Sequence, residues 1–83
     1  MIHRKKILPE YYKDVVSGDK TFEIRKDEDN IQVGDILVLE EFDGEKYTGF
    51  GTERVVTYVL RNCPEYGLMD GYCIIGMQPM WWE

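Results

Sequence analysis

The sequence holds few of the residues that build metal sites and disulfides. Its 83 residues include one histidine, His3, and two cysteines, Cys63 and Cys73. A structural zinc site takes four ligands, so these three side chains do not fill one, and we expect no metal and no cofactor. We expect no secretory leader before the cysteines, and we therefore expect both thiols to be reduced. His3 has no evident partner in the sequence, which favours a surface or structural role.

Long hydrophobic runs are also missing. The longest apolar stretches, such as residues 36–39, have the length of a strand, whereas a membrane-spanning helix needs about 20 apolar residues. We therefore expect a cytoplasmic protein that does not bind a membrane. A glycine-rich phosphate loop is absent as well, because Gly44, Gly49 and Gly51 fall in a predicted hairpin rather than between a strand and a helix.

The apolar residues that are present suffice for one compact domain over residues 1–83. Hydrophobic residues make up 43% of the chain and aromatic residues 13%, which argues against disorder for most of it. The net charge of −6 argues against sequence-blind coating of nucleic acid, since such binding depends on neutralising phosphates.

The charge is unevenly distributed along the chain. Residues 1–26 carry seven Lys or Arg against four Asp or Glu, while residues 27–83 carry three against twelve. The first part can therefore form a local basic rim, although Lys5 and Lys6 also suit an edge strand that must stay soluble. The candidate members of the rim are Arg4, Lys5, Lys6, Lys20, Arg25 and Lys26.

Periodicity and turn residues predict one helix and five strands. Pro9 starts a helix with apolar residues at positions 11, 12, 15 and 16, and the helix ends at Gly18. We expect a mobile acidic loop over residues 27–30. The fold is therefore predicted to be mainly β, of the α+β class: a five-stranded barrel with one helix after the first strand, whose closure removes exposed strand edges. The expected strands cover residues 2–8, 20–26, 36–39, 52–60 and 71–77.

Residues 18–25 bring several charged groups together. With the period of a strand, Thr21, Glu23 and Arg25 share one face, and Lys20, just after a turn, can bend to the same side. A Lys, a carboxylate and a guanidinium beside a hydroxyl suit binding of a polar planar ligand or proton transfer.

A simpler interpretation of this stretch is an ordinary half-buried strand. Phe22 and Ile24 share the opposite face, and Glu23 and Arg25 then form a weak ion pair on the solvated side. Spacing alone favours this interpretation over a functional one.

The same residues resemble a known signature. Gly18, Lys20, Glu23 and Arg25 are similar to the G-x-K-x-x-E-x-R signature of ASCH domains, which belong to the PUA-like superfamily of small β-barrels. Residues 32–37 look like the V-G-D turn that follows this signature, and residues 66–72 look like the ending of a small ASCH-like branch found in bacteria and phages. The resemblance covers residues 2–77 and implies a PUA-like five-stranded barrel.

For function, the resemblance implies a module that binds RNA or a nucleoside-like small molecule. Lys20, Glu23 and Arg25 would line a cleft between the helix and the barrel. There Glu23 would accept a hydrogen bond from the exocyclic amine of a base, and Arg25 or Lys20 would hold a carbonyl or phosphate. Candidate stacking aromatics are Tyr12, Tyr58, Tyr66 and Tyr72, of which we assign Tyr66 to the ligand site.

An enzyme is the first alternative. Some ASCH-like proteins resemble amidohydrolases that act on N4-acylated cytidine through a K-T-x-T-x-R strand. This chain matches Lys20, Thr21 and Arg25, but Glu23 stands in place of the second Thr, which removes the hydroxyl expected to be the nucleophile. If the chain is an enzyme, its catalytic residues are Lys20, Thr21 and Glu23, with Glu23 as general base and Lys20 stabilising an oxyanion. A second carboxylate would come from Glu40, Glu41 or Glu53.

The second alternative is a non-catalytic module that binds protein. Met80, Trp81 and Trp82 are too apolar for an ordinary terminus. They either cover one barrel opening or form a patch for self-association through Trp81 and Trp82.

Overall fold

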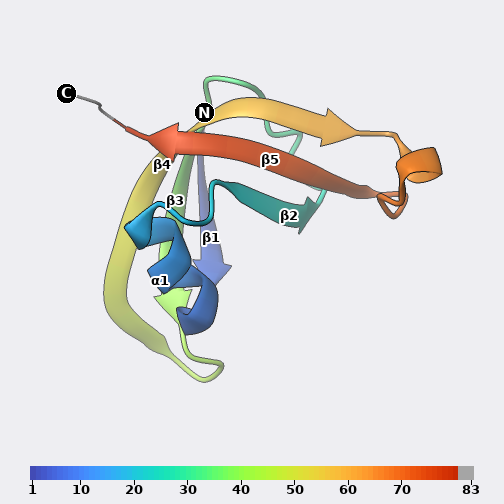
Figure 1. The fold of residues 1–83 in the computed structure, drawn as a ribbon. Coiled ribbons are helices and arrows are strands. Elements are labelled where there is room, and N and C mark those ends of the chain that lie inside the picture. The colour runs from blue at the N-terminus through green and yellow to red at the C-terminus, as the bar shows by residue number, and fades with distance from the viewer. Residues whose placement is uncertain (81–83) are drawn as a thin grey trace.

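The computed structural model describes residues 1–80 of the chain, and Trp81 and Trp82 lie outside the described residues (Figure 1). One α-helix follows the first strand, as predicted, and the chain is mainly β. The elements are β1 (Ile2–Ile7), α1 (Pro9–Ser17), β2 (Phe22–Lys26), β3 (Ile36–Phe42), β4 (Tyr47–Arg61), a short 3-10 helix η1 (Pro64–Tyr66) and β5 (Tyr72–Pro79).

The five strands form one mixed sheet that curls into a half-barrel. Its order is β1-β3-β4-β5-β2, with β1 and β3 parallel and the other neighbours antiparallel. β4 is long and strongly bent in Figure 1, so that its first part pairs with β3 and its second part with β5. β1 and β2 are the two edges, which corrects the expectation that closure removes the strand edges.

The local sequence explains where α1 begins and ends. Pro9 stands at the first helical position, where its missing N–H costs nothing. Gly18 ends the helix in the left-handed region at φ +90°, and its N–H donates to the carbonyl of Val15 at 3.1 Å. The guanidinium of Arg54 donates to the same carbonyl at 3.1 Å, which fastens the end of the helix to β4.

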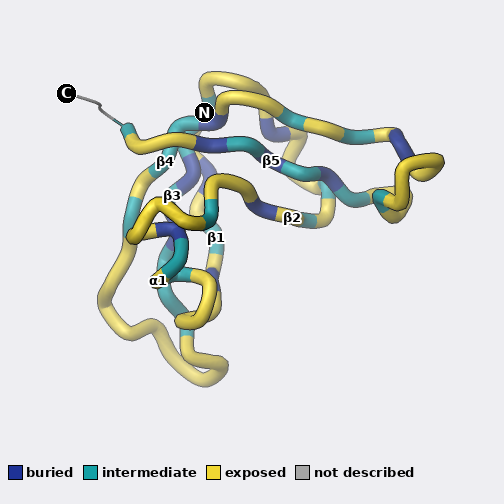
Figure 2. The backbone as a smooth tube through the Cα atoms, viewed as in Figure 1, coloured by how far each residue is buried: buried dark blue, intermediate teal, exposed yellow. Residues whose placement is uncertain are grey.

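The core lies on the inner face of the curled sheet, under α1 and the loop that joins β2 to β3 (Figure 2). Of the predicted apolar stripe of α1, Val15 is buried and Tyr12 packs against the core, while Tyr11 and Val16 are exposed. Both cysteines are free and buried, as expected for reduced thiols. The core residues are Ile7, Val15, Ile31, Leu37, Leu39, Val56, Cys73, Ile75 and Met77.

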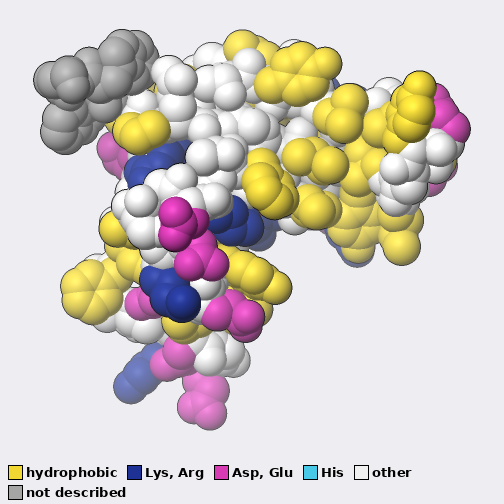
Figure 3. Space-filling view, viewed as in Figure 1, with side chains coloured by type: hydrophobic (Ala, Val, Ile, Leu, Met, Phe, Trp, Pro, Cys, Tyr) yellow, Lys and Arg dark blue, Asp and Glu magenta, His cyan; other side chains and the backbone are white. Residues whose placement is uncertain are grey.

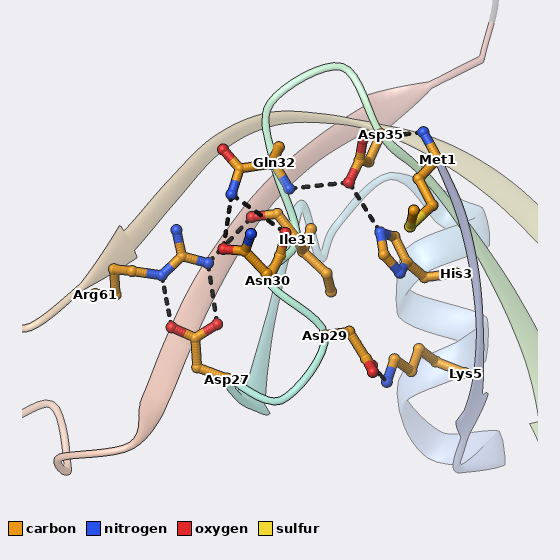
Figure 4. Close-up of polar contacts among 10 residues, drawn as sticks. All are labelled: Met1, His3, Lys5, Asp27, Asp29, Asn30, Ile31, Gln32, Asp35 and Arg61. Atoms are coloured by element: carbon orange, nitrogen blue, oxygen red, sulfur yellow. Dashed lines mark hydrogen bonds and ion pairs between the residues drawn. The ribbon is translucent and has the colours of Figure 1, made fainter.

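The acidic loop after β2 is anchored, which corrects the expectation of a mobile segment (Figure 4). Asp27 forms a two-point ion pair with Arg61 of β4, with N–O distances of 2.5 and 3.0 Å. Asp29 pairs with Lys5 of β1, and Ile31 is buried in the core. Two ion pairs and one apolar anchor therefore fix a loop that its composition alone marked as mobile.

His3 has a partner after all, at the end of the same loop (Figure 4). The side chain of His3 is buried, and its Nε2 lies 2.8 Å from Oδ2 of Asp35. The same carboxylate accepts hydrogen bonds from the backbone N–H of Gln32 at 3.0 Å and from the amino group of Met1 at 3.1 Å. These contacts, the one with His3 first, lower the pKa of Asp35 to about 2. Of the two roles predicted for His3, surface or structural, its burial and its contact with Asp35 favour the structural one.

Candidate functional site

The face of strand β2 that is buried is the opposite of the one that the simpler interpretation predicts. Its apolar residues Phe22 and Ile24 are 44% and 55% exposed, whereas Glu23 between them is 4% exposed. The prediction that Glu23 forms a solvated ion pair is therefore wrong. A carboxylate this deeply buried is costly unless it is paired, so its partners decide what the site can do.

Glu23 is held between two cations. Lys20 donates to Oε1 of Glu23 and also to the backbone carbonyl of Phe22, the latter at 2.8 Å. Arg25 donates to Oε2 of Glu23 from Nε at 3.1 Å and from Nη2 at 2.7 Å. Both oxygens of the carboxylate are thus engaged. We call Lys20, Glu23 and Arg25 the clamp.

Arg25 also links the two open edges of the sheet. Its Nη2 donates to the backbone carbonyl of Lys6 in β1 at 2.6 Å. A closed barrel would join β1 and β2 by backbone hydrogen bonds, and here a side chain of β2 reaches the backbone of β1 instead. The clamp therefore lies where the half-barrel is open.

A cleft of about 470 Å³ occupies this opening. Its charged residues are Lys6, Lys20, Arg25 and Glu23, which give the lining a net positive charge within a chain of net charge −6. Two aromatic rings flank the ammonium of Lys20, with ring centres 5.4 Å away for Tyr11 and 5.3 Å away for Phe22. The remaining lining residues are the aliphatic Ile7, Leu8 and Ile24.

The structure brings together three of the five predicted site residues. Lys20, Glu23 and Arg25 meet in the cleft, while Thr21 and Tyr66 are not among the residues that line it. Tyr66 belongs to η1 and is 85% exposed. The other candidate stacking residues, Tyr12, Tyr58 and Tyr72, do not line the cleft either.

Sequence reasoning missed the aromatic residues of the cleft. Tyr11 was assigned to the apolar stripe of α1, and Phe22 to the face of β2 opposite Glu23 and Arg25. The sequence did contain a signal for Tyr11. It lies in the first turn of α1, and the end of α1 leads directly to Lys20, so the two residues could be expected on the same side of the sheet edge. Among residues 1–80 there is no group of three His, Cys, Asp or Glu side chains placed to hold a metal ion.

A family model described as a domain of unknown function, DUF3850, matches residues 2–77. The chain belongs to the DUF3850 family. The matched range of this DUF3850 domain contains every residue of the cleft. No curated protein matches the chain. In the described part of the DUF3850 domain, no helix has the length and apolar character needed to cross a membrane.

Proposed function

We propose that this DUF3850 domain binds a nucleotide, either free or as an exposed residue of single-stranded RNA, in the cleft between α1 and β2. The observation that carries the proposal is the buried carboxylate of Glu23 clamped between Lys20 and Arg25 in a cleft with apolar and aromatic walls. Burial of a carboxylate and partial burial of two cations cost stability, and a ligand site is one reason for a chain to keep them.

The clamp leaves donors free for an anion. An ammonium has three N–H donors, and Lys20 uses two of them on Glu23 and Phe22. Within the described residues, Nη1 of Arg25 has no hydrogen-bond partner. A phosphate oxygen is the natural acceptor for both groups. The other charges of the chain are mostly acidic, so they oppose a long RNA more than a single nucleotide.

The walls of the cleft suit a base. Tyr11 is 45% and Phe22 44% exposed, so each ring offers a free surface on which a base could stack. A volume of about 470 Å³ lies within the usual range of small-molecule sites. The resemblance to ASCH domains supports the same ligand class. The expected cytoplasmic location stays a prediction.

Glu23 acts in this proposal by positioning the two cations. Its side chain is 6% exposed and both oxygens already accept hydrogen bonds from Lys20 and Arg25. A direct contact with the exocyclic amine of a base would require that one cation move away. The same occupancy, and the absence of Thr21 from the cleft lining, disfavour the amidohydrolase alternative.

An NMR titration tests the proposal. Labelled protein is titrated with cytidine 5′-monophosphate, with cytidine and with a short single-stranded RNA, while the amides of β2 and of the first turn of α1 are followed. N4-acetylcytidine is included, and release of acetate would establish the amidohydrolase instead. We expect shifts confined to the cleft and an unchanged ligand.

Arg25→Ala provides the quantitative prediction. Loss of the guanidinium should weaken nucleotide binding by about 1–3 kcal/mol, provided that it makes a two-point contact. Arg4→Ala is the matched control, because Arg4 lies on the edge strand β1, has a side chain that is 68% exposed and does not line the cleft. Equal affinity of Arg25→Ala and wild type would rule out the cleft as the nucleotide site.

A further inference from the structure

The outer face of the sheet is uncovered where β2, β5 and β4 lie side by side. Two rows of paired residues cross these strands in register. One row is Ile24, Ile74 and Leu60, and the other is Phe22, Gly76 and Tyr58. We call these six residues the outer face. Figure 3 shows hydrophobic side chains gathered over the part of the molecule formed by β2 and β5, while many of the charged side chains in that view lie over α1 and the β3–β4 end.

The outer face is large for so small a domain. Tyr58 is 62%, Ile24 55%, Phe22 44% and Leu60 38% exposed. With full side-chain areas of roughly 150–250 Å², these fractions leave on the order of 400 Å² of apolar surface in water. The largest apolar patch of an ordinary monomer is about 300–600 Å² and is often functional. Here it falls on a chain of only 83 residues.

The charges around the outer face permit a second copy of the same chain as the occupant. Two copies of a chain with net charge −6 repel one another over most of their surface. The outer face contains no charged residue, and the position that follows Ile24 on the same side of β2 is a cation, Lys26. Two outer faces can therefore meet without placing acidic groups against one another.

We propose that the outer face binds the outer face of a second copy, so that the two sheets form a sandwich. Two such faces, with their immediate surroundings, would bury on the order of 1,000 Å² in total, which is the lower limit for a specific interface. The dimer should therefore be weak and depend on protein concentration. Apolar side chains packed between two sheets are the usual core of such a sandwich.

Tyr58 and Leu60 allow this proposal to be tested apart from nucleotide binding. Phe22 and Ile24 belong to the outer face but also line the cleft, whereas Tyr58 and Leu60 on β4 do not. Substitutions at these two positions place a charge on the outer face and leave the clamp intact. Both side chains are exposed in the monomer, so a charged replacement should not unfold it.

Sedimentation velocity from about 10 µM to about 1 mM protein is the experiment. We expect the apparent mass of the wild type to rise from 9.8 kDa towards twice that value. Leu60→Lys and Tyr58→Lys should remain monomeric over the same range. Phe50→Lys is the matched control, because Phe50 is 66% exposed on β4 but lies outside the outer face, and it should dimerise like the wild type.

Two results would overturn the proposal. One is a wild type that stays monomeric throughout, and the other is a dimer that survives both Leu60→Lys and Tyr58→Lys. Removal of residues 81–83 tests the alternative that the chain self-associates through Trp81 and Trp82. A dimer that is lost on this removal but retained in Leu60→Lys and Tyr58→Lys forms through these terminal residues. Concentration-dependent amide shifts of the wild type provide a check that needs no variant, and they should fall on β2, β4 and β5.

Discussion

Replacement of Glu23 by Gln isolates what the clamp does. The amide keeps the shape of the side chain but removes the negative charge that two cations share. The side chain of Glu23 is 6% exposed, and those of Lys20 and Arg25 are 17% and 24% exposed. In the variant both cations stay in place, partly desolvated, without their common partner.

The loss of stability follows from that burial. Breaking a fully buried ion pair by removing one partner costs about 3–5 kcal/mol, while an exposed pair contributes about 0–1 kcal/mol. The clamp lies between these limits, because its carboxylate is buried and its cations still reach water. Glu23→Gln should therefore lower the free energy of unfolding by about 1–3 kcal/mol, which for a domain of this size lowers Tm by roughly 5–20 °C.

The same substitution should increase the preference of the cleft for a nucleotide over a nucleoside. Because Lys20 and Arg25 stay in place in the variant, their contacts with the phosphate and the stacking of the base on the cleft walls are the same as in the wild type. The difference between the two ligands then comes from the negative charge removed near the phosphate. At a distance of about 6 Å, this removal should strengthen nucleotide binding relative to nucleoside binding by about 1 kcal/mol, or roughly fivefold. Glu23→Gln should thus be less stable yet more selective for cytidine 5′-monophosphate over cytidine.

Urea unfolding and calorimetric titration measure the two effects. Glu53→Gln is the control, since it removes the same charge from an exposed position outside the cleft and should change stability by no more than about 0.5 kcal/mol. A variant as stable as the wild type would show that the clamp contributes nothing to the fold. A selectivity ratio that stays the same or falls would show that Glu23 contacts the ligand or that the phosphate binds elsewhere.

Two further predictions concern groups outside the cleft. The pKa of Asp35 is about 2 in the folded protein and 3.8 ordinarily, so the contacts of its carboxylate stabilise the fold above pH 3.8, and this stabilisation is lost as the pH falls towards 2. Asp35→Asn should therefore flatten the pH dependence of urea unfolding in that range, and an unchanged slope would contradict the assignment. Burial raises the pKa of the Cys73 thiol, and Cys63 is 8% exposed, so neither should react with Ellman's reagent until urea unfolds the chain. Fast reaction of the native protein would show that one of them is accessible.

Much of the fold follows from local sequence signals. Pro9 and Gly18 bound the helix because one lacks an N–H and the other accepts a positive φ. The five strands were predicted close to their observed positions, except that β3 and β4 extend further, because the polar residues Glu40 and Glu41 continue β3 and the residues around Gly49 continue β4. Periodicity weakens where a strand leaves the core, so such extensions escape it.

The orientation of β2 and the anchored loop depend on contacts between distant parts of the chain. A period of two tells which residues share a face but not which face is buried. The hydrophobicity of Phe22 and Ile24 favours one answer, and the partners of Glu23 impose the other. Arg61, which holds Asp27, lies 34 positions away along the chain, beyond the reach of any local pattern.

The open edge of the half-barrel and the buried clamp depend on one another. On the inner face of a closed barrel, Glu23 would lie beside Ile75 in the core with no route for cations to reach it from solvent. Because β1 and β2 do not pair, Lys20 and Arg25 can enter from the opening, neutralise the carboxylate and link β2 to the carbonyl of Lys6. Burial of Glu23 then turns Phe22 and Ile24 outward, since neighbouring positions on a strand face opposite sides. The polar cleft and the apolar outer face are therefore two consequences of one orientation of β2.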